Sequence, residues 1–293
     1  MTDERALWVV VDEVDDELVT HLAAAATARD VRLLTVDAGA VDLLQLPQLG
    51  DGDMLYRIGG SHRACVAEQL LWGQDVATFY GDSLGPHRLL DTQELLLARA
   101  GVPVPRATYA LPATVDELRH AVDELGGFPI VIKRPGSSLG VGVMRLDTWT
   151  SLVGVVDALR AEGGDAFTLM AYVAPAVHWR VIVVADEVVA SYRNPVSDDD
   201  FRTEVCEEND ADFSAPVPPL AADAARAATT ALGLRCAGVD VLVHESGAVV
   251  VLEANFPFYF AHPKRTGGVD VALRMVDALL ASASHGGGSD SSF

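Results

Sequence analysis

The sequence predicts a mixed fold, α/β at its N-terminus and α+β beyond it, and three observations carry this prediction. Residues 6–11 read as a buried strand, 16–29 as an Ala-rich helix and 31–36 as a second strand, which together make a βαβ opening. Helical and strand-like segments continue to alternate up to about residue 173. After that point the chain is dominated by strand-like segments.

Composition and charge narrow the class of protein. The chain has 293 residues, of which 50% are hydrophobic and 22% charged, so a disordered or fibrous chain is excluded. The formal net charge is −21. Such a field repels phosphate backbones and acidic membranes, so we predict neither a nucleic-acid nor a membrane partner. Any bound nucleotide must be held by a local cluster of positive charge.

The cysteines and the N-terminus favour a cytoplasmic enzyme. Cys65, Cys206 and Cys236 are far apart and form no Cys-x-x-Cys pair, which indicates reduced thiols. The start of the chain lacks the basic region and the apolar length of a signal peptide. The sequence leaves open whether copies of the chain form a homo-oligomer.

We predict an N-terminal α/β domain over residues 1–86. The turn after its first strand, residues 12–16, is acidic rather than glycine-rich, and its charge would repel a pyrophosphate. Dinucleotide binding at this turn is therefore not expected. Pro86 marks the boundary, and a helix over residues 89–100 ends at Gly101.

A central domain is predicted over residues 87–173. Thr114 and Glu117 have the spacing of a capping box and predict the start of a helix that runs to Leu125. The other expected elements are strands at 128–133, 141–146 and 167–173 and a helix at 148–162.

A C-terminal α+β domain is predicted over residues 174–281. Its expected strands are 181–184, 188–192, 239–244 and 249–254. The acidic, proline-containing segment 196–219 reads as a loop, and Pro218 and Pro219 open a helix that ends at Gly233. Residues 282–293 are Ser- and Gly-rich and read as a disordered tail.

Two predicted strands near the C-terminus form a hairpin that carries three oxygen-bearing side chains. If Ser246 and Gly247 are its two-residue loop, Asp240 lies opposite Glu253, and Asn255 shares their face. Opposed acids about 5 Å apart repel by about 3 kcal/mol at an effective dielectric of about 20. Something positive should lie between them, and these hard oxygen ligands suit Mg²⁺. The alternative is a solvated hairpin end with one acid protonated or turned away.

A second group of residues combines a lysine with a glycine-rich loop. Lys133 ends a strand and precedes the loop 134–142, the reverse of the P-loop order, so the loop is expected to act as a flap. Its backbone N–H groups would close over phosphate oxygens while Lys133 supplies a point charge. A tight hairpin between two core strands is the alternative. Arginines at three further positions offer positive charge for a triphosphate, namely Arg88, Arg180 and Arg202.

The order of these segments resembles the ATP-grasp superfamily, and within it the ribosomal-protein glutamate-ligase (RimK-like) branch. The resemblance covers about residues 53–280. Its strongest segments are Gly127 to Lys133, Asp186 to Ala190 leading to Asp200-Phe201-Arg202-Thr203, and Ala237-Gly238-Val239-Asp240 leading to Glu253-Ala254-Asn255. The resemblance implies an ATP-grasp fold in which ATP lies between two α+β domains.

The resemblance also implies roles for individual residues. Asp240, Glu253 and Asn255 would hold two Mg²⁺ ions, which Mn²⁺ can replace. Arg180 and Arg202 would stabilise the transferred phosphoryl group and the tetrahedral oxyanion as catalytic residues. The implied ATP-binding residues, which include the phosphate contacts, the flap and an adenine hinge, are Arg88, Lys133, Gly136, Ser137, Ser138, Gly140, Met170, Ala171, Tyr172 and Val173.

The sequence departs from the family pattern at several of these places. Ala171 stands where an acid is common in the hinge, and His178 where an aspartate is usual, so ribose recognition lacks its usual acids. Glu204 replaces the asparagine expected two residues after Arg202. Four aromatics within residues 256–260 replace a small Ser-Pro-Gly stretch, and beside the metal site they would give an amine-acceptor cavity apolar character. The predicted substrate pocket is Arg193, Glu204, Phe256 and Tyr259.

From the resemblance we predict an ADP-forming, ATP-dependent C–N ligase. A substrate carboxylate would attack the γ-phosphate to give an acylphosphate, and an amine would then displace phosphate to form an amide. The substrate would be an amino acid, a peptide or a related small metabolite in a biosynthetic reaction. The sequence does not separate joining of two molecules from ring closure within one. A small-molecule kinase and a nucleotide-binding module without turnover are the alternatives.

Overall fold

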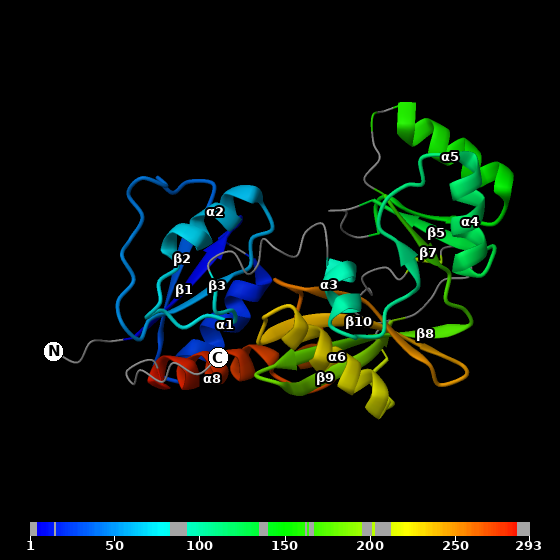
Figure 1. Cartoon of the computed structure of the whole chain (residues 1–293). Helices are drawn as coiled ribbons and strands as arrows, with labels where there is room; N and C mark the ends of the chain where they lie inside the picture. Colours follow the sequence, from blue (N-terminus) through cyan, green and yellow to red (C-terminus); the bar gives the residue numbers. More distant parts are fainter. Residues whose placement is uncertain are drawn as a thin grey trace.

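The chain folds into three bodies, each built around its own sheet (Figure 1). The computed structural model describes residues 5–14, 16–82, 93–134, 140–161, 163, 167–194, 201–202 and 212–285. The first and last bodies lie side by side, and the middle one stands above one end of the last. The predicted mixture of α/β and α+β architecture is confirmed. In the part of the chain described, no helix combines the length and apolarity that crossing a membrane requires.

The N-terminal sheet is parallel, with strand order β2-β1-β3. Its strands are β1 (Ala6–Val11), β2 (Arg32–Asp37) and β3 (Met54–Arg57). Helix α1 (Glu17–Thr27) packs with Leu7, Val9 and Val11, whereas α2 (His62–Leu71) packs with Val10 and Leu55. Because helices cover both faces, β1 is a nearly continuous apolar run rather than an alternating one.

Strand β3 and helix α2 were not among the predicted elements. The strand ends in Arg57, whose charge is unusual for a core position, yet the side chain is buried. Its Nε lies 2.7 Å from Oε2 of Glu68 on α2, so each charge balances the other. The pairing of Arg57 with Glu68 depends on the tertiary fold and leaves no local pattern in the sequence.

The central body is an antiparallel sheet with order β4-β7-β5-β6, covered on one face by two helices (Figure 1). Its strands are β4 (Ala107–Thr108), β5 (Ile130–Lys133), β6 (Val143–Leu146) and β7 (Thr168–Ala171). The helices are α4 (Val115–Leu125) and α5 (Trp149–Ala161). The predicted capping box of Thr114 and Glu117 is confirmed, and Gly126 ends α4 in the left-handed region.

The C-terminal sheet is antiparallel, with order β11-β10-β8-β9. Its strands are β8 (Ala176–Val184), β9 (Glu187–Asn194), β10 (Cys236–His244) and β11 (Val249–Asn255). Helix α6 (Pro219–Ala231) packs on one face against alternate residues such as Val181 and Val239. The residues between them point to the other face, where α8 (Val271–His285) shares a core with Ile182 and Cys236. The short helix α7 (His262–Thr266) precedes α8.

Two predicted domain boundaries do not coincide with the way the residues pack in the structure. Helix α3 (Gln93–Arg99) lies in the expected central domain, 87–173, but its Leu97 is buried in the core under α6. Residues 93–104 therefore pack with the C-terminal sheet. At the other end, α8 continues to His285, four residues into the segment 282–293 that was expected as a tail. The sequence has no glycine or proline near residue 281 that would stop the helix there.

Candidate active site

The hairpin β10–β11 brings the two predicted acids together. Asp240 is paired with Glu253, as the sequence predicts, but the loop differs from the expected one. His244 N donates to Ala248 O, so the loop holds three residues, Glu245 to Gly247. A register shift between Asp240 and Val241 then inserts one extra residue in β11 and restores the predicted pairing.

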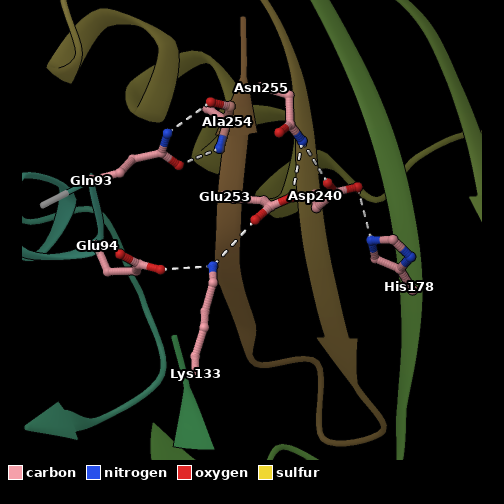
Figure 2. Close-up of polar contacts among 8 residues, drawn as sticks. All are labelled: Gln93, Glu94, Lys133, His178, Asp240, Glu253, Ala254 and Asn255. Atoms are coloured by element: carbon pink, nitrogen blue, oxygen red, sulfur yellow. Dashed lines mark hydrogen bonds and ion pairs between the residues drawn. The ribbon is translucent and has the colours of Figure 1, made fainter. Parts of the chain in front are cut away.

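The amide of Asn255 lies between the two acids (Figure 2). Its Nδ2 donates to Asp240 Oδ2 at 3.0 Å and to Glu253 Oε1 at 3.1 Å. The three predicted metal ligands therefore share one face of the hairpin. A donor sits where the sequence requires something positive, which relieves the repulsion between the carboxylates.

Lys133 reaches this group from the central body. It ends β5, and its Nζ lies 2.8 Å from Glu94 Oε1 and 3.2 Å from Glu253 Oε2 (Figure 2). Burial acts to lower the pKa of Lys133, but the carboxylates of Glu253 and Glu94 outweigh it and the pKa lies above its usual value. The ammonium thus bridges two of the three bodies of the chain.

Strand β8 supplies the other charged neighbours of Asp240. Arg180 is directly opposite Asp240, with its Nε 3.2 Å from Asp240 Oδ1, and its Nη1 donates to Gly238 O at 3.1 Å. His178 Nε2 lies 3.0 Å from the same Oδ1, and Asn194 Nδ2 lies 3.0 Å from His178 Nδ1. With the Asn194 amide on the Nδ1 side, His178 Nε2 is the ring atom that donates to Asp240.

These contacts keep Asp240 ionised. Burial alone would raise the pKa of its carboxyl group, but Arg180, the hydrogen bond from His178 and the charge of Lys133 lower it below the usual value. His178, which stands where the family usually has an aspartate, is buried and supports this carboxylate. With histidine in place of the usual aspartate, this position offers Asp240 a hydrogen-bond donor instead of a second negative charge.

The flap is described only in part. Gly136, Ser137 and Ser138 lie outside the described residues, as do Arg88 and Glu204. Gly140, with φ +70°, contacts Arg202: a Cβ there would lie 3.2 Å from Arg202 Cδ, and Arg202 Nη1 donates to Gly140 O at 3.3 Å. Arg202 is therefore placed against the flap, whereas Arg180 lies among the acids.

The predicted hinge lies at the end of β7. Met170 is buried and paired with Val131, and Ala171 N donates to Arg106 O at 2.8 Å. Tyr172 carries the guanidinium of Arg145 over its ring at 4.6 Å and meets the ring of Phe201 edge-on. Val173 follows on the way to β8, so these four residues connect the central body to the C-terminal sheet.

The predicted substrate pocket is not brought together. Phe256 packs in an aromatic cluster with Tyr56, Phe79 and Tyr80. Tyr259 donates to Glu17 on α1 at 2.8 Å. Arg193 is ion-paired with Asp212. These three side chains thus contact three different sets of partners, and the contacts of the described residues do not join them to the acids.

Sequence reasoning missed two residues of the site on α3. Glu94 pairs with Lys133, and Gln93 bonds both backbone groups of Ala254, accepting from N at 2.6 Å and donating to O at 2.9 Å. Both lie in the first turn of a helix, where polar residues are ordinary. No motif could have indicated their contacts with a lysine 39 residues away and a strand 161 residues away.

The carboxylates of Asp240 and Glu253 need further ligands if they are to hold a metal ion. Among the described residues, no group of three His, Cys, Asp or Glu side chains is arranged to hold a metal ion. Two carboxylates and one amide nevertheless form a hard oxygen set that suits a hydrated Mg²⁺ completed by phosphate oxygens. Asn255 would then present its Oδ1 in place of Nδ2.

Comparison with known proteins agrees with the observed fold. The solved structure of the ATP-grasp ligase PsnB with a minimal precursor matches 95% of this chain and 99% of its own, with a TM-score of 0.74 and 18% identity. The fold is therefore that of the ATP-grasp class. The family model of the RimK-like ATP-grasp domain matches residues 92–279. The chain belongs to the RimK-like ATP-grasp family.

Curated relatives carry ligase names. A probable alpha-L-glutamate ligase of Citrobacter koseri is 34% identical over 184 residues, which cover 62% of this chain and 59% of that protein. A ribosomal protein bS6–L-glutamate ligase of Escherichia coli O139:H28 is 32% identical over the same length, with the same coverage. This chain thus spans about three-fifths of the length of these relatives.

Proposed function

We propose that the chain is an ATP-dependent carboxylate–amine ligase that forms an amide bond through an acylphosphate and releases ADP and phosphate. One observation carries the proposal. Lys133 of the central body lies 3.2 Å from Glu253, which Asn255 joins to Asp240, and these last three residues are called the triad below. The ligase names of the two curated relatives support it.

The triad would hold Mg²⁺, with two ions as the family implies and Mn²⁺ as a substitute. When bound, the metal would supply positive charge that neutralises the charge developing on the phosphate oxygens. Solved structures of PsnB with Mg and ADP show that combination in a protein of the same fold. Asp240 is kept as a carboxylate by Arg180 and His178, so it is ready to serve as a ligand.

The residues of this chain would position and stabilise the reacting groups. Lys133 and Arg88 would contact the phosphates, and residues 170–173 would hold adenine through backbone groups. Arg180, held beside Asp240, would face the transferred phosphoryl group, while Arg202 would act together with the flap that it contacts at Gly140. The substrate carboxylate attacks the γ-phosphorus and ADP leaves; the amine then attacks the acyl carbon and phosphate leaves.

The substrate class we propose is an amino acid, a peptide or an amino-acid-derived metabolite. The curated relatives are named for glutamate, and PsnB has been solved with its precursor peptide PsnA2. Ring closure within one molecule is a variant of the same chemistry. No contact among the described residues favours a kinase, and the charged, hydrogen-bonded triad argues against a module without turnover.

A phosphate-release screen tests the proposal. The protein is incubated with ATP, Mg²⁺ and pairs of candidate acids and amines, beginning with glutamate and acidic peptides. We expect ADP and phosphate only when both the acid and the amine are present. Formation of AMP and pyrophosphate would overturn the proposal, and a stable phosphorylated product formed without an amine would identify a kinase.

A further inference from the structure

The acids of the proposed metal site are already neutralised by donors of the chain itself. Lys133 Nζ lies 3.2 Å from Glu253, and Asn255 Nδ2 donates to both Glu253 and Asp240 (Figure 2). An ammonium at this distance supplies the positive charge that a divalent cation would supply. A metal ion that binds Glu253 therefore competes with Lys133 for the charge of this carboxylate.

Glu94 offers the displaced ammonium a second partner. Its Oε1 is the nearer of the two carboxylate contacts of Lys133, at 2.8 Å, and its side chain is 15% exposed. The first turn of α3 is fixed to β11 by the two hydrogen bonds between Gln93 and the backbone of Ala254. Glu94 is thus held beside the proposed metal ligands, and its side chain pairs with Lys133.

The choice of lysine at this position supports an exchange of partners. The chain has only two lysines, Lys133 and Lys264, against nineteen arginines. An ammonium is a point charge with three rotatable donors and can change partners, whereas a guanidinium locks onto a carboxylate through a planar fork. An arginine at position 133 would therefore compete more strongly than lysine with a metal ion for Glu253.

We propose that Lys133 is an exchangeable internal counter-ion of the metal site and that Glu94 is its positioning residue. Without metal, Lys133 is shared between Glu94 and Glu253. When Glu253 turns to the metal, Glu94 keeps the ammonium paired and beside the path of the phosphates. This inference rests on the proposed metal-dependent function, but it concerns a step that precedes nucleotide and substrate binding.

Titration with Mn²⁺ in the absence of nucleotide tests the counter-ion. Lys133→Met keeps the aliphatic stem and removes the competitor, so it should bind Mn²⁺ about fivefold more tightly, whereas Lys133→Arg should bind it about fivefold more weakly. Glu94→Gln should also weaken Mn²⁺ binding, because the displaced ammonium would lose its partner. Glu124→Gln removes the same charge from an exposed position of α4 and should leave binding unchanged.

Labelling of amines tests the positioning role directly. Lys264, paired with Asp270 at 2.7 Å, is an internal reference for the labelling of Lys133 by acetic anhydride, read by peptide mass spectrometry. Adding Mg²⁺ should raise Lys133 labelling several-fold in Glu94→Gln and much less in the wild-type protein. An equal rise in both would overturn the role of Glu94, and unchanged Mn²⁺ affinity in Lys133→Met would overturn the counter-ion. Absence of ligase turnover would affect neither readout.

Discussion

At the scale of single residues, the acids of the site are stable because each is matched to a donor. Asp240 is bonded to Arg180, His178 and Asn255, whereas Glu253 is bonded to Asn255 and Lys133. Asp240 is buried, and Glu253 is 38% exposed. Removing Glu253 should therefore disturb the fold less than removing Asp240, which would leave the buried Nε2 of His178 without its acceptor.

Glu253→Ala should abolish metal-dependent turnover while leaving the fold intact. The change removes one metal ligand, and Lys133 keeps its bond to Glu94. We expect ADP release to fall by about 100-fold or more and the free energy of unfolding to change by less than about 1 kcal/mol. Phosphate, which is released together with ADP, reports the turnover, and urea denaturation gives the free energy of unfolding. Glu245→Ala, in the exposed turn of the same hairpin, is the control; wild-type turnover in Glu253→Ala would refute the metal assignment.

Lys133→Ala should raise the ATP concentration needed for half-maximal turnover. The ammonium is the described cation closest to Glu253, and its removal takes one positive charge from the proposed phosphate site. We expect the KM for ATP to rise about tenfold with a smaller change in the KM for the amine. Steady-state kinetics with each substrate varied in turn makes the measurement. A change confined to the amine would show that Lys133 serves the acceptor instead.

Gly238 is required because two side chains approach its backbone. A Cβ at this position would lie 2.9 Å from Arg180 Nη1 and 3.0 Å from Phe258 Cβ. Gly238→Ala should displace the guanidinium from Asp240, lower kcat about tenfold and cost about 1–3 kcal/mol of stability. Gly60→Ala, where a Cβ would meet nothing within 4 Å, is the matched control for both measurements. A wild-type kcat in Gly238→Ala would mean that the position of Arg180 does not limit the reaction.

At the scale of elements, the sequence predicts regular hairpins and helices well and irregularities poorly. The pairing of Asp240 with Glu253 was predicted correctly from a two-residue loop that the protein does not have. The three-residue loop moves the register by one residue, and the bulge in β11 moves it back. Neither irregularity has a signal in this sequence, whereas the alternation that puts acids on one face does.

The same contrast separates predicted helices from missed ones. The helix α4 was predicted because Thr114 and Glu117 form a local motif, and α1 because its segment is rich in alanine and lies between two strand-like runs. The pairs Arg57–Glu68 and Glu94–Lys133 join different elements, so their meaning exists only in the folded chain. For this reason Glu94 was missed as a site residue.

Thr114→Ala should weaken the central body without touching the site. The hydroxyl of Thr114 accepts from Glu117 N at 3.2 Å, and its loss should destabilise the first turn of α4 by about 1 kcal/mol. Hydrogen exchange should quicken in residues 115–118, while Mn²⁺ binding stays unchanged. Thr230→Ala, on the exposed face of α6, removes a threonine hydroxyl that caps no helix. Equal effects of the two substitutions on α4 exchange would exclude the capping role.

At the scale of the whole molecule, the N-terminal body and the C-terminal sheet are joined through one core. Helix α8 packs on the C-terminal sheet and against α1, so residues of both bodies belong to a single hydrophobic cluster. The aromatic residues after Asn255 extend this junction, with Phe256 against Tyr56 and Tyr259 bonded to Glu17. Phe256 and Tyr259 thus tie the end of strand β11, which carries the proposed metal ligands, to the N-terminal body.

This junction should weaken at high pH through Tyr259. Burial and the hydrogen bond to Glu17 raise the pKa of Tyr259 to about 12. Because the folded pKa exceeds the unfolded value of about 10, the contribution of Tyr259 to stability is complete below about pH 10 and is lost as the pH rises towards 12. Between about pH 9 and about pH 11, the wild-type protein should therefore lose more stability than Tyr259→Phe, which has no phenol to ionise. Urea unfolding at the two pH values gives the difference, in which the ionisation of all other groups cancels. Equal losses in the two proteins would show that the bond between Tyr259 and Glu17 does not hold the bodies together.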